Sequence, residues 1–510
     1  MRKAALPLAG VVLSLASLTI AATPAIQPDA VLAHIRFLAS DDLQGRANGS
    51  EGLQKAGDYI AQQFKSAGLR PGGKDGGWFQ PFELVAGLEI GEGNEVVIQS
   101  RGARAVQLTL GSSFMPLSVT PNDSTTAPSE DLRKLPLVFA GYGISSTPLG
   151  YDDYADLDVS GKAVLIFSHE PQENDRDSRF NGTRPIRETT LYAKAMAART
   201  RGARVLIVVS DPAHQTDPVD YGQFKIEQDS EDHSIPVLRV SRTGMAPLLR
   251  QWGLDNIAAQ IDRDLRPRSR ALADTTLDYM EHLSKKRRIV RNVVGVLTGS
   301  DSLKEPQAIV VGAHYDHVGL GGRFSAAPDR TGEIHNGADD NASGTASVIE
   351  IARAAAADRA RFPRSLVFVT FAGEERGLLG SAFYANNPVI PIGDTVAMLN
   401  LDMVGRANGK VNVSGLDMAP SLERDMDAAG KGVGIDVRHE GPGAGRSDDS
   451  SFLDRRIPAI NFFTGFHNDY HRPTDDWDKI DAAGTARVAT LALEFAARIA
   501  ARNDRPEFKP

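Results

Sequence analysis

Short apolar runs alternate with longer helical segments in the C-terminal part of the chain, from Arg288 onward. Short apolar strands that alternate with helices are typical of a mixed, mostly parallel α/β sheet flanked by helices. The predicted strands are Asn292–Leu297, Ala308–Ala313, Leu366–Ala372, Val396–Leu401, Val411–Ser414 and Ala459–Phe463, and the clearest helices are Thr345–Ala357 and Arg487–Arg502.

Two different patterns precede this region. Asp29–Gly68 is predicted to be mostly helical, because its apolar residues recur at helical spacing on both sides of a Gly/Asn/Ser break at Gly45–Gly52. From roughly Leu110 to Asp264, short β-like runs are separated by polar, Pro- and Gly-containing stretches, with one good helix at Glu188–Arg201. The middle region is therefore predicted to be an inserted β-rich domain.

Length, charge and cysteine count narrow the class of protein. The chain has 510 residues, and a single hydrophobic core rarely supports a chain of this length. Two domains, or one domain with a large insertion, are therefore expected. The net charge of -8 gives no support for nucleic acid or an anionic membrane surface as a partner. Because the chain has no cysteine, any metal site must be built from His, Asp and Glu.

Residues 1–22 have the pattern of a secretory signal peptide. A basic head at Arg2 and Lys3 is followed by an apolar stretch and by small residues around Ala21, Ala22 and Ala25. The alternative is a membrane anchor, but the apolar stretch is short for a bilayer and no stop-transfer charges follow it. We therefore expect a periplasmic or secreted protein whose signal peptide is removed and which has no stable membrane anchor.

Five clusters rich in His, Asp or Glu occur in the C-terminal region, and four of them follow predicted strands. In open α/β sheets, ligands bind beyond the carboxyl ends of the strands, so these four are predicted to lie on one edge. Asp340 instead lies just before the helix that begins near Ser343, as a plausible N-cap whose loop can reach the same edge. The clusters centre on His314, Asp340, Glu374–Glu375, Asp402 and His471.

This set of side chains is suited to zinc, which binds His nitrogen and carboxylate oxygen. Two zinc ions about 3.5–4 Å apart need a bridging carboxylate, and the set suffices for two terminal ligands per ion plus one bridge. Such a site needs a general base, and Glu374 beside Glu375 is placed for that role. Asp316 is predicted to accept the second ring N–H of His314 and to fix its orientation. The clusters together predict a zinc-dependent peptidase.

Taken together, the motifs resemble the M28 family of co-catalytic zinc aminopeptidases, in the bacterial exported form with an inserted protease-associated (PA) domain. They read His-x-Asp, Gly-Ala-Asp-Asp-Asn-Ala-Ser-Gly, Glu-Glu-x-Gly-Leu-x-Gly-Ser, Asn-x-Asp-Met and Tyr-His-x-Pro-x-Asp in that order. Leu38–Gly52 resembles the N-terminal segment of these proteins. Tyr142, Tyr151 and Tyr154 with Asp156–Ile166 resemble the PA domain. The likeness covers nearly all of the mature chain.

The resemblance implies a zinc-exopeptidase fold, of the phosphorylase/hydrolase-like kind, with a β-rich PA insertion. It divides the chain into a signal peptide (1–22), an N-terminal part of the peptidase domain (23–110), an inserted PA-like domain (111–265) and the M28 catalytic domain (266–510).

The resemblance also implies two Zn²⁺ per chain and a role for each site residue. His314 and Asp402 with bridging Asp340 would hold one ion, and Glu375 and His471 with Asp340 the other. Asp339 is the bridge instead if the alignment slips by one residue. The remaining roles are Glu374 as general base, Tyr470 as a donor to the developing oxyanion, and Arg446 as a substrate contact.

One departure from the family concerns the loop after Arg446. The family often has Ser-Asp-His where this chain has Ser447-Asp448-Asp449, which puts substrate contacts near this loop in doubt. Three further histidines lie near the clusters, although the ligand count is complete without them, and His467 could line the substrate pocket. These histidines are His317, His335 and His467.

The function expected from the sequence is an exopeptidase that removes N-terminal residues from peptides, as a monomer or weak oligomer. A carboxypeptidase acting on acidic peptides is the main alternative on the same fold. A glutaminyl cyclase uses one zinc, and a receptor-like protein would have lost ligands, so the intact five-ligand set argues against both.

Overall fold

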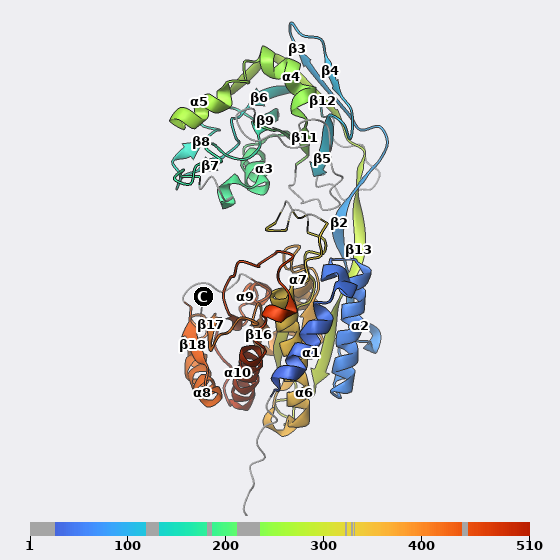
Figure 1. Cartoon of the computed structure of the whole chain (residues 1–510). Helices are drawn as coiled ribbons and strands as arrows, with labels where there is room; N and C mark the ends of the chain where they lie inside the picture. Colours follow the sequence, from blue (N-terminus) through green and yellow to red (C-terminus); the bar gives the residue numbers. More distant parts are fainter. Residues whose placement is uncertain are drawn as a thin grey trace, which may run out of the picture. The chain divides into compact units, whose positions relative to one another are not determined.

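The computed structural model describes residues 26–118, 132–180, 186–211, 235–321, 324–327, 330, 332–440 and 447–509 (Figure 1). The predicted signal peptide, residues 1–22, lies outside the described residues. The chain divides into two compact units, which we call the main unit (the chain up to Phe82 together with Arg291–Pro510) and the inserted unit (Glu83–Val290). Among the described residues, no helix combines the length and apolar character needed to cross a membrane.

A nine-stranded mixed sheet forms the centre of the main unit, in the order β1-β13-β15-β14-β16-β19-β17-β18, with β2 paired to β13. The neighbours β15, β14, β16 and β19 are parallel to one another, whereas β13 and β17 flank this group as antiparallel strands. The mostly parallel α/β sheet is therefore confirmed. The strands are β1 (Arg70–Pro71), β2 (Phe79–Ile90), β13 (Leu283–Leu297), β14 (Ala308–His314), β15 (Ser365–Phe371), β16 (Thr395–Leu401), β17 (Lys410–Ser414), β18 (Asp436–His439) and β19 (Ala459–Phe463).

Helices cover both faces of this sheet. On one face, Val310 and Val369 pack with Tyr384 of α7 and Phe452 of α9. Successive residues of a strand point to opposite faces, so Phe368 points the other way, where its ring meets Phe64 of α2. The helices α1, α2 and α10 pack against α6. The helices are α1 (Pro28–Leu38), α2 (Glu51–Ser66), α6 (Gly344–Ala357), α7 (Leu379–Asn386), α8 (Glu423–Val433), α9 (Ser450–Leu453) and α10 (Ala482–Ala501).

The helical N-terminal region predicted from the sequence is present, with a break at residues 39–50 that overlaps the predicted break at Gly45–Gly52. A 3₁₀ segment, Asp41–Arg46, separates α1 from α2. Ser50 caps α2 by accepting the N–H of Leu53 at 3.1 Å, as expected of a serine at a helix N-terminus.

The inserted unit contains an eight-stranded sheet in the order β4-β3-β12-β6-β9-β10-β11-β5 and a two-stranded sheet, β7-β8. The unit is wider than the predicted insertion at 111–265, because β3, β4 and β12 lie outside those bounds yet pair into its sheet. The strands are β3 (Glu95–Ser100), β4 (Val106–Leu108), β5 (Phe114–Ser118), β6 (Leu132–Phe139), β7 (Ser145–Ser146), β8 (Tyr151–Asp152), β9 (Ala163–Phe167), β10 (Val205–Val209), β11 (Val237–Val240) and β12 (Arg270–Met280); the helices are α3 (Leu191–Thr200), α4 (Arg242–Gln251) and α5 (Ile257–Asp264).

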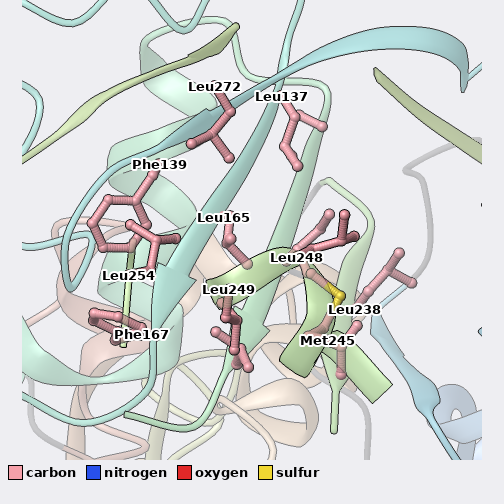
Figure 2. Close-up of a cluster of buried hydrophobic side chains, with 14 of the residues drawn as sticks. Leu137, Phe139, Leu165, Phe167, Leu238, Met245, Leu248, Leu249, Leu254 and Leu272 are labelled. Atoms are coloured by element: carbon pink, nitrogen blue, oxygen red, sulfur yellow. The ribbon is translucent and has the colours of Figure 1, made fainter. Parts of the chain in front are cut away.

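Strand β9 shows how this sheet separates two apolar cores. Leu165 and Phe167 point into a cluster with Leu248 and Leu249 of α4 (Figure 2). The residue between them, Ile166, points to the opposite face and packs with the alanines of α3. Every residue of β9 is buried, which explains why its sequence is a continuous apolar run rather than an alternating one.

Candidate metal centre

The carboxyl ends of four parallel strands bring the predicted clusters to one edge of the main sheet. His314 is the last residue of β14, and Asp402 directly follows β16. The Glu374–Glu375 pair follows β15 after a short turn, and His471 lies in the loop after β19. Asp340 lies in an irregular helical turn, Ala338–Ser343, that leads into α6. The structure thus places all five clusters together.

The two oxygens of Asp340 face two different histidines. Oδ1 lies 3.3 Å from Nε2 of His314, and Oδ2 lies 3.1 Å from Nε2 of His471. His314 Nε2 is also 3.5 Å from Oδ1 of Asp402, and His471 Nε2 is 3.1 Å from Oε2 of Glu375. Ligand atoms bound at about 2.0–2.1 Å to a tetrahedral zinc lie about 3.3 Å apart, so both groups have the spacing of a zinc site. Asp340 is shared between them.

The neighbouring Asp339 is engaged elsewhere. Its Oδ1 accepts the N–H of Gly405 at 2.6 Å and the hydroxyl of Ser343 at 3.0 Å, and its Oδ2 lies 3.0 Å from Nε2 of His467. His467, predicted to line the substrate pocket, therefore contacts Asp339. Asp340 was also predicted as an N-cap of α6, which is wrong: Oδ1 of Asn341 accepts the N–H of Gly344 at 2.9 Å.

The role predicted for Asp316 needs a correction. Nδ1 of His314 donates to the main-chain carbonyl of Asp316 at 3.1 Å and lies 3.9 Å from its carboxylate. The chain turns after β14 so that the carboxylate points to the loop after β15 instead. There it accepts the N–H groups of Glu374 and Glu375 at 3.2 and 3.3 Å, and the side chain of Asn48 at 2.6 Å. Asp316 therefore orients the glutamate pair.

Ion pairing within the second group shifts the pKa values of its members in opposite directions. Burial alone would raise the pKa of Glu375, but His471 and His317 outweigh it and bring this pKa to about 2. Burial would lower the pKa of His471, but Glu375 and Asp340 raise it to about 11. Protons on imidazoles balance the carboxylates here, and a divalent cation would take the place of those protons.

Glu374 differs from its neighbour. Burial raises its pKa well above the ordinary value, and Glu375 and Asp448 add to this shift while His314 opposes it. Its Oε2 lies 3.9 Å from Nε2 of His314, and 15% of its side chain is exposed. A raised pKa strengthens a carboxylate as a proton acceptor, and Glu374 lies next to the pair formed by His314 and Asp402.

The residues present fit two zinc ions. The two candidate groups are His314, Glu374 and Asp402, and His317, Asp340, Glu375 and His471. Oδ1 of Asp402 is buried and has no hydrogen-bond partner among the described residues, as expected of an oxygen that serves as a ligand. The set consists of imidazole nitrogens and carboxylate oxygens, which are the ligands of zinc hydrolases.

Tyr470 was predicted to donate to the developing oxyanion, and Arg446 to contact the substrate. The ring of Tyr470 stacks on that of His471, with centroids 4.0 Å apart and an interplanar angle of 24°. Burial raises the pKa of Tyr470, and Asp340 and Glu375 add to the shift, so the hydroxyl keeps its proton. Arg446 lies outside the described residues.

Asp475, which was not predicted from the sequence, holds the backbone of the shared aspartate. Its Oδ2 accepts the N–H groups of Asp339 and Asp340 at 2.9 and 3.1 Å, and its Oδ1 lies 3.1 Å from Arg406. Asp475 is the final aspartate of the Tyr-His-x-Pro-x-Asp motif, so its place in that motif was the available signal.

Arg46 and Asp448 were missed as well. Arg46 is fully buried, and among the described residues its side chain donates only to main-chain carbonyls, including those of Asn336 and Gly337. An arginine in the Gly/Asn-rich break of Leu38–Gly52 was its only signal. Asp448, the residue before the departure from the family pattern at Asp449, is also fully buried, and burial raises its pKa to about 7.

Known protein families and structures agree with this fold. The sequence model of Peptidase family M28 matches residues 292–496, and that of the PA domain matches residues 133–248. The main unit thus carries an α/β peptidase fold with a candidate two-metal centre. The chain thus contains a region of peptidase family M28 in the main unit and a PA domain in the inserted unit.

Individual relatives share parts of the sequence or the whole fold. Leupeptin-inactivating enzyme 1 of Streptomyces exfoliatus is 31% identical over 163 residues, which are 32% of this chain and 34% of that protein. The chain thus spans about a third of that curated relative. The structure of an aminopeptidase from Aneurinibacillus sp. strain AM-1 is similar over 96% of this chain and 97% of that chain, with a TM-score of 0.56 and 24% identity. The structure of BSAP, a zinc aminopeptidase from Bacillus subtilis, is similar over 96% of this chain and 99% of that chain, with a TM-score of 0.54 and 21% identity. The last two similarities show a shared fold.

Proposed function

We propose that the protein is a zinc-dependent aminopeptidase that hydrolyses N-terminal residues from peptides. The observation that carries the proposal is the carboxylate of Asp340, which has one oxygen at each of two histidine-containing groups of ligand atoms. The match of residues 292–496 to peptidase family M28 and the fold shared with two aminopeptidases support the same activity.

In this proposal, two zinc ions are held by five residues. His314 and Asp402 would hold one ion, Glu375 and His471 the other, and Asp340 would bridge both. When bound, the ions would polarise the scissile carbonyl and lower the pKa of a water molecule.

The residues around the ligands then move and place protons. Glu374 takes a proton from the attacking water and passes it to the leaving amine, because its carboxylate lies beside the ligand His314, with Oε2 3.9 Å from Nε2. Asp316 holds the turn that carries Glu374, through hydrogen bonds to two consecutive N–H groups. The protonated hydroxyl of Tyr470 donates to the oxyanion that develops at the carbonyl.

We also propose that residues 1–22 direct export and are removed, so that the mature protein is periplasmic or secreted. The support is the basic, apolar and small-residue pattern of the N-terminal sequence. N-terminal sequencing of protein recovered from the periplasm or medium tests this, and an intact N-terminus would contradict it.

The activity is tested by hydrolysis of leucine p-nitroanilide beside its N-acetylated form, with a zinc-stripped sample as control. Zinc-dependent cleavage of the free-amine substrate alone is expected. If neither substrate is cleaved while zinc is bound, peptides with a free acidic C-terminus and N-terminal glutaminyl peptides are tested next. Cleavage or cyclisation of those would replace the aminopeptidase assignment with a carboxypeptidase or a cyclase.

A further inference from the structure

His317 lies in the second group of ligand atoms, although the five assigned ligands do not include it. Its side chain is fully buried, and its Nδ1 lies 2.9 Å from Oε1 of Glu375 and 3.9 Å from Oδ2 of Asp340. The ring stands nearly perpendicular to that of His471, with centroids 5.4 Å apart and an angle of 82°. His317 therefore either binds the second metal directly or acts through Glu375.

The two oxygens of Glu375 have different partners. Oε2 lies 3.1 Å from Nε2 of His471, at the spacing of two ligands of one ion. Oε1 is within hydrogen-bond distance of Nδ1 of His317. A hydrogen bond at Oε1 occupies the oxygen that would otherwise be free to bind the same ion as Oε2.

The hydrogen bonding of the second ring nitrogen distinguishes a histidine that binds the metal from one that acts through Glu375. Ligating histidines generally donate their other ring N–H to an acceptor. His314 and His471 both do so. Nδ1 of His314 donates to the carbonyl of Asp316 at 3.1 Å, and Nδ1 of His471 donates to the carbonyl of Phe324 at 2.6 Å.

His317 has the opposite arrangement. Its Nε2 is buried without a hydrogen-bond partner among the described residues. A proton on Nε2 would be buried and unpaired, whereas a proton on Nδ1 is donated to Glu375. The favoured tautomer of His317 therefore carries its proton on Nδ1, which prevents Nδ1 from being a ligand.

The ring of His317 is fixed by close packing. Its main-chain N–H donates to the carbonyl of Arg46 at 3.2 Å. Gly337, at a φ of +58°, lies against the ring, and a Cβ there would come within 2.5 Å of Cδ2 of His317. Only glycine leaves room for the ring at this point, so the imidazole has a defined direction toward Glu375.

We infer that His317 is a positioning residue that holds Glu375 as a one-oxygen ligand and thereby keeps a coordination position of the second zinc open. This rests on the two-zinc function proposed above. Catalytic zinc sites have three protein ligands and an open position, whereas four protein ligands close a site. With Asp340, His471 and one oxygen of Glu375, the second site has three.

The test compares three variants of the full mature chain by cobalt titration after zinc removal. Asn places an N–H near the position of Nδ1, Gln places one near Nε2, and Ala places none. We expect His317→Ala and His317→Gln to bind two cobalt ions, with the weaker site losing ~10–100-fold in affinity. Their visible cobalt absorption should also weaken, because a second Glu375 oxygen raises the coordination number. His317→Asn should restore both readouts to near the wild-type values.

A matched control is His34→Asn, which changes a buried histidine bonded to Glu350 of α6 at 3.0 Å. It should bind cobalt like the wild type. Saturation of His317→Ala and His317→Asn alike at one cobalt per chain would overturn the inference and make His317 a ligand. Unchanged affinity and absorption in all variants would overturn it too. A wild-type chain that binds fewer than two cobalt ions would instead refute the two-zinc function itself.

Discussion

Nε of Arg46 donates to the main-chain carbonyl of Tyr315 at 2.9 Å. The same guanidinium reaches the carbonyls of Asn336 and Gly337 at 2.6 and 3.0 Å. One side chain from the N-terminal region therefore connects the loop that follows His314 to the loop that precedes Asp340. Burial lowers the pKa of Arg46 to about 10, although nearby carboxylates raise it, so the guanidinium stays charged at neutral pH.

Arg46→Met is expected to destabilise the protein by at least about 3 kcal/mol, because each buried carbonyl left without a donor costs about 1–3 kcal/mol. The zinc content after dialysis should fall as well. Urea unfolding and elemental analysis measure the two effects. The control is Arg36→Met, since Arg36 is exposed and lies over the ring of Trp477 at 4.2 Å. Equal unfolding midpoints in the two variants would contradict the prediction.

Glu374→Gln and Glu375→Gln are expected to separate catalysis from metal binding. The first removes a proton acceptor, so zinc should stay at two per chain while turnover falls by ~10²–10⁴-fold or more. The second weakens a ligand, so zinc should be lost from one site. Elemental analysis and leucine p-nitroanilide hydrolysis on the same samples measure both. Loss of metal in Glu374→Gln alone would show that the two glutamates have the opposite roles.

Zinc binding is expected to tighten as the pH rises. In the ion-paired centre the pKa of His471 is about 11, so zinc must displace a proton from this ligand at neutral pH. Each displaced proton increases the apparent affinity by up to about tenfold per pH unit. Competition with a chelator of known affinity, at several pH values from about 6 to 9, measures how the apparent zinc affinity changes with pH. A flat profile would mean that His471 is not a ligand.

The chelated protein should show the converse effect on stability. The pKa of His471 is raised on folding, so its ion pairs stabilise the fold fully below its unfolded pKa of about 6.5. That contribution is lost as the pH rises toward about 11. Unfolding midpoints of chelated protein should therefore fall over this range, and a His471→Gln variant should lose this part of the pH dependence.

The inserted unit should lose stability between about pH 4 and pH 7. Burial raises the pKa of Asp153 from 3.8 to about 7. The folded state therefore keeps a proton that the unfolded chain has released, and stability falls with rising pH in that window and levels above it. Burial lowers the pKa of Lys194 to about 8, so this group makes the stability rise with pH only above about pH 8.

Fluorescence of Trp252 measures this effect in a chain with Trp78→Phe and Trp477→Phe, because Trp252 is the tryptophan of the inserted unit. Asp153→Asn is the informative variant, since it cannot release the proton. In this variant the urea concentration at the unfolding midpoint should change little with pH between about 4 and 7. A slope that persists in Asp153→Asn would assign the pH dependence to other groups.

The sequence predicted the edge at which the centre forms, because apolar runs mark buried strands and parallel strands end together. It could not predict which acceptor each ring would meet. His314 binds the carbonyl of Asp316 rather than its carboxylate, and this depends on the path of a turn. Arg46 was missed, and His317 was named without a role, because their partners are distant in sequence. The pairing of β3 with β12 in the inserted unit could not be predicted either, since the two strands are far apart in the sequence.

The hydrogen bonds of Asp475 have a consequence for when the centre can assemble during synthesis. Asp475 comes from the loop before the last helix and fixes the peptide of Asp340, while Arg46, near the other end of the chain, fixes the carbonyls just before it. The bridge is therefore complete only after both ends of the chain have been made and have docked on the sheet. A product truncated before His471 would retain every strand of the main sheet and still lack a formed metal centre.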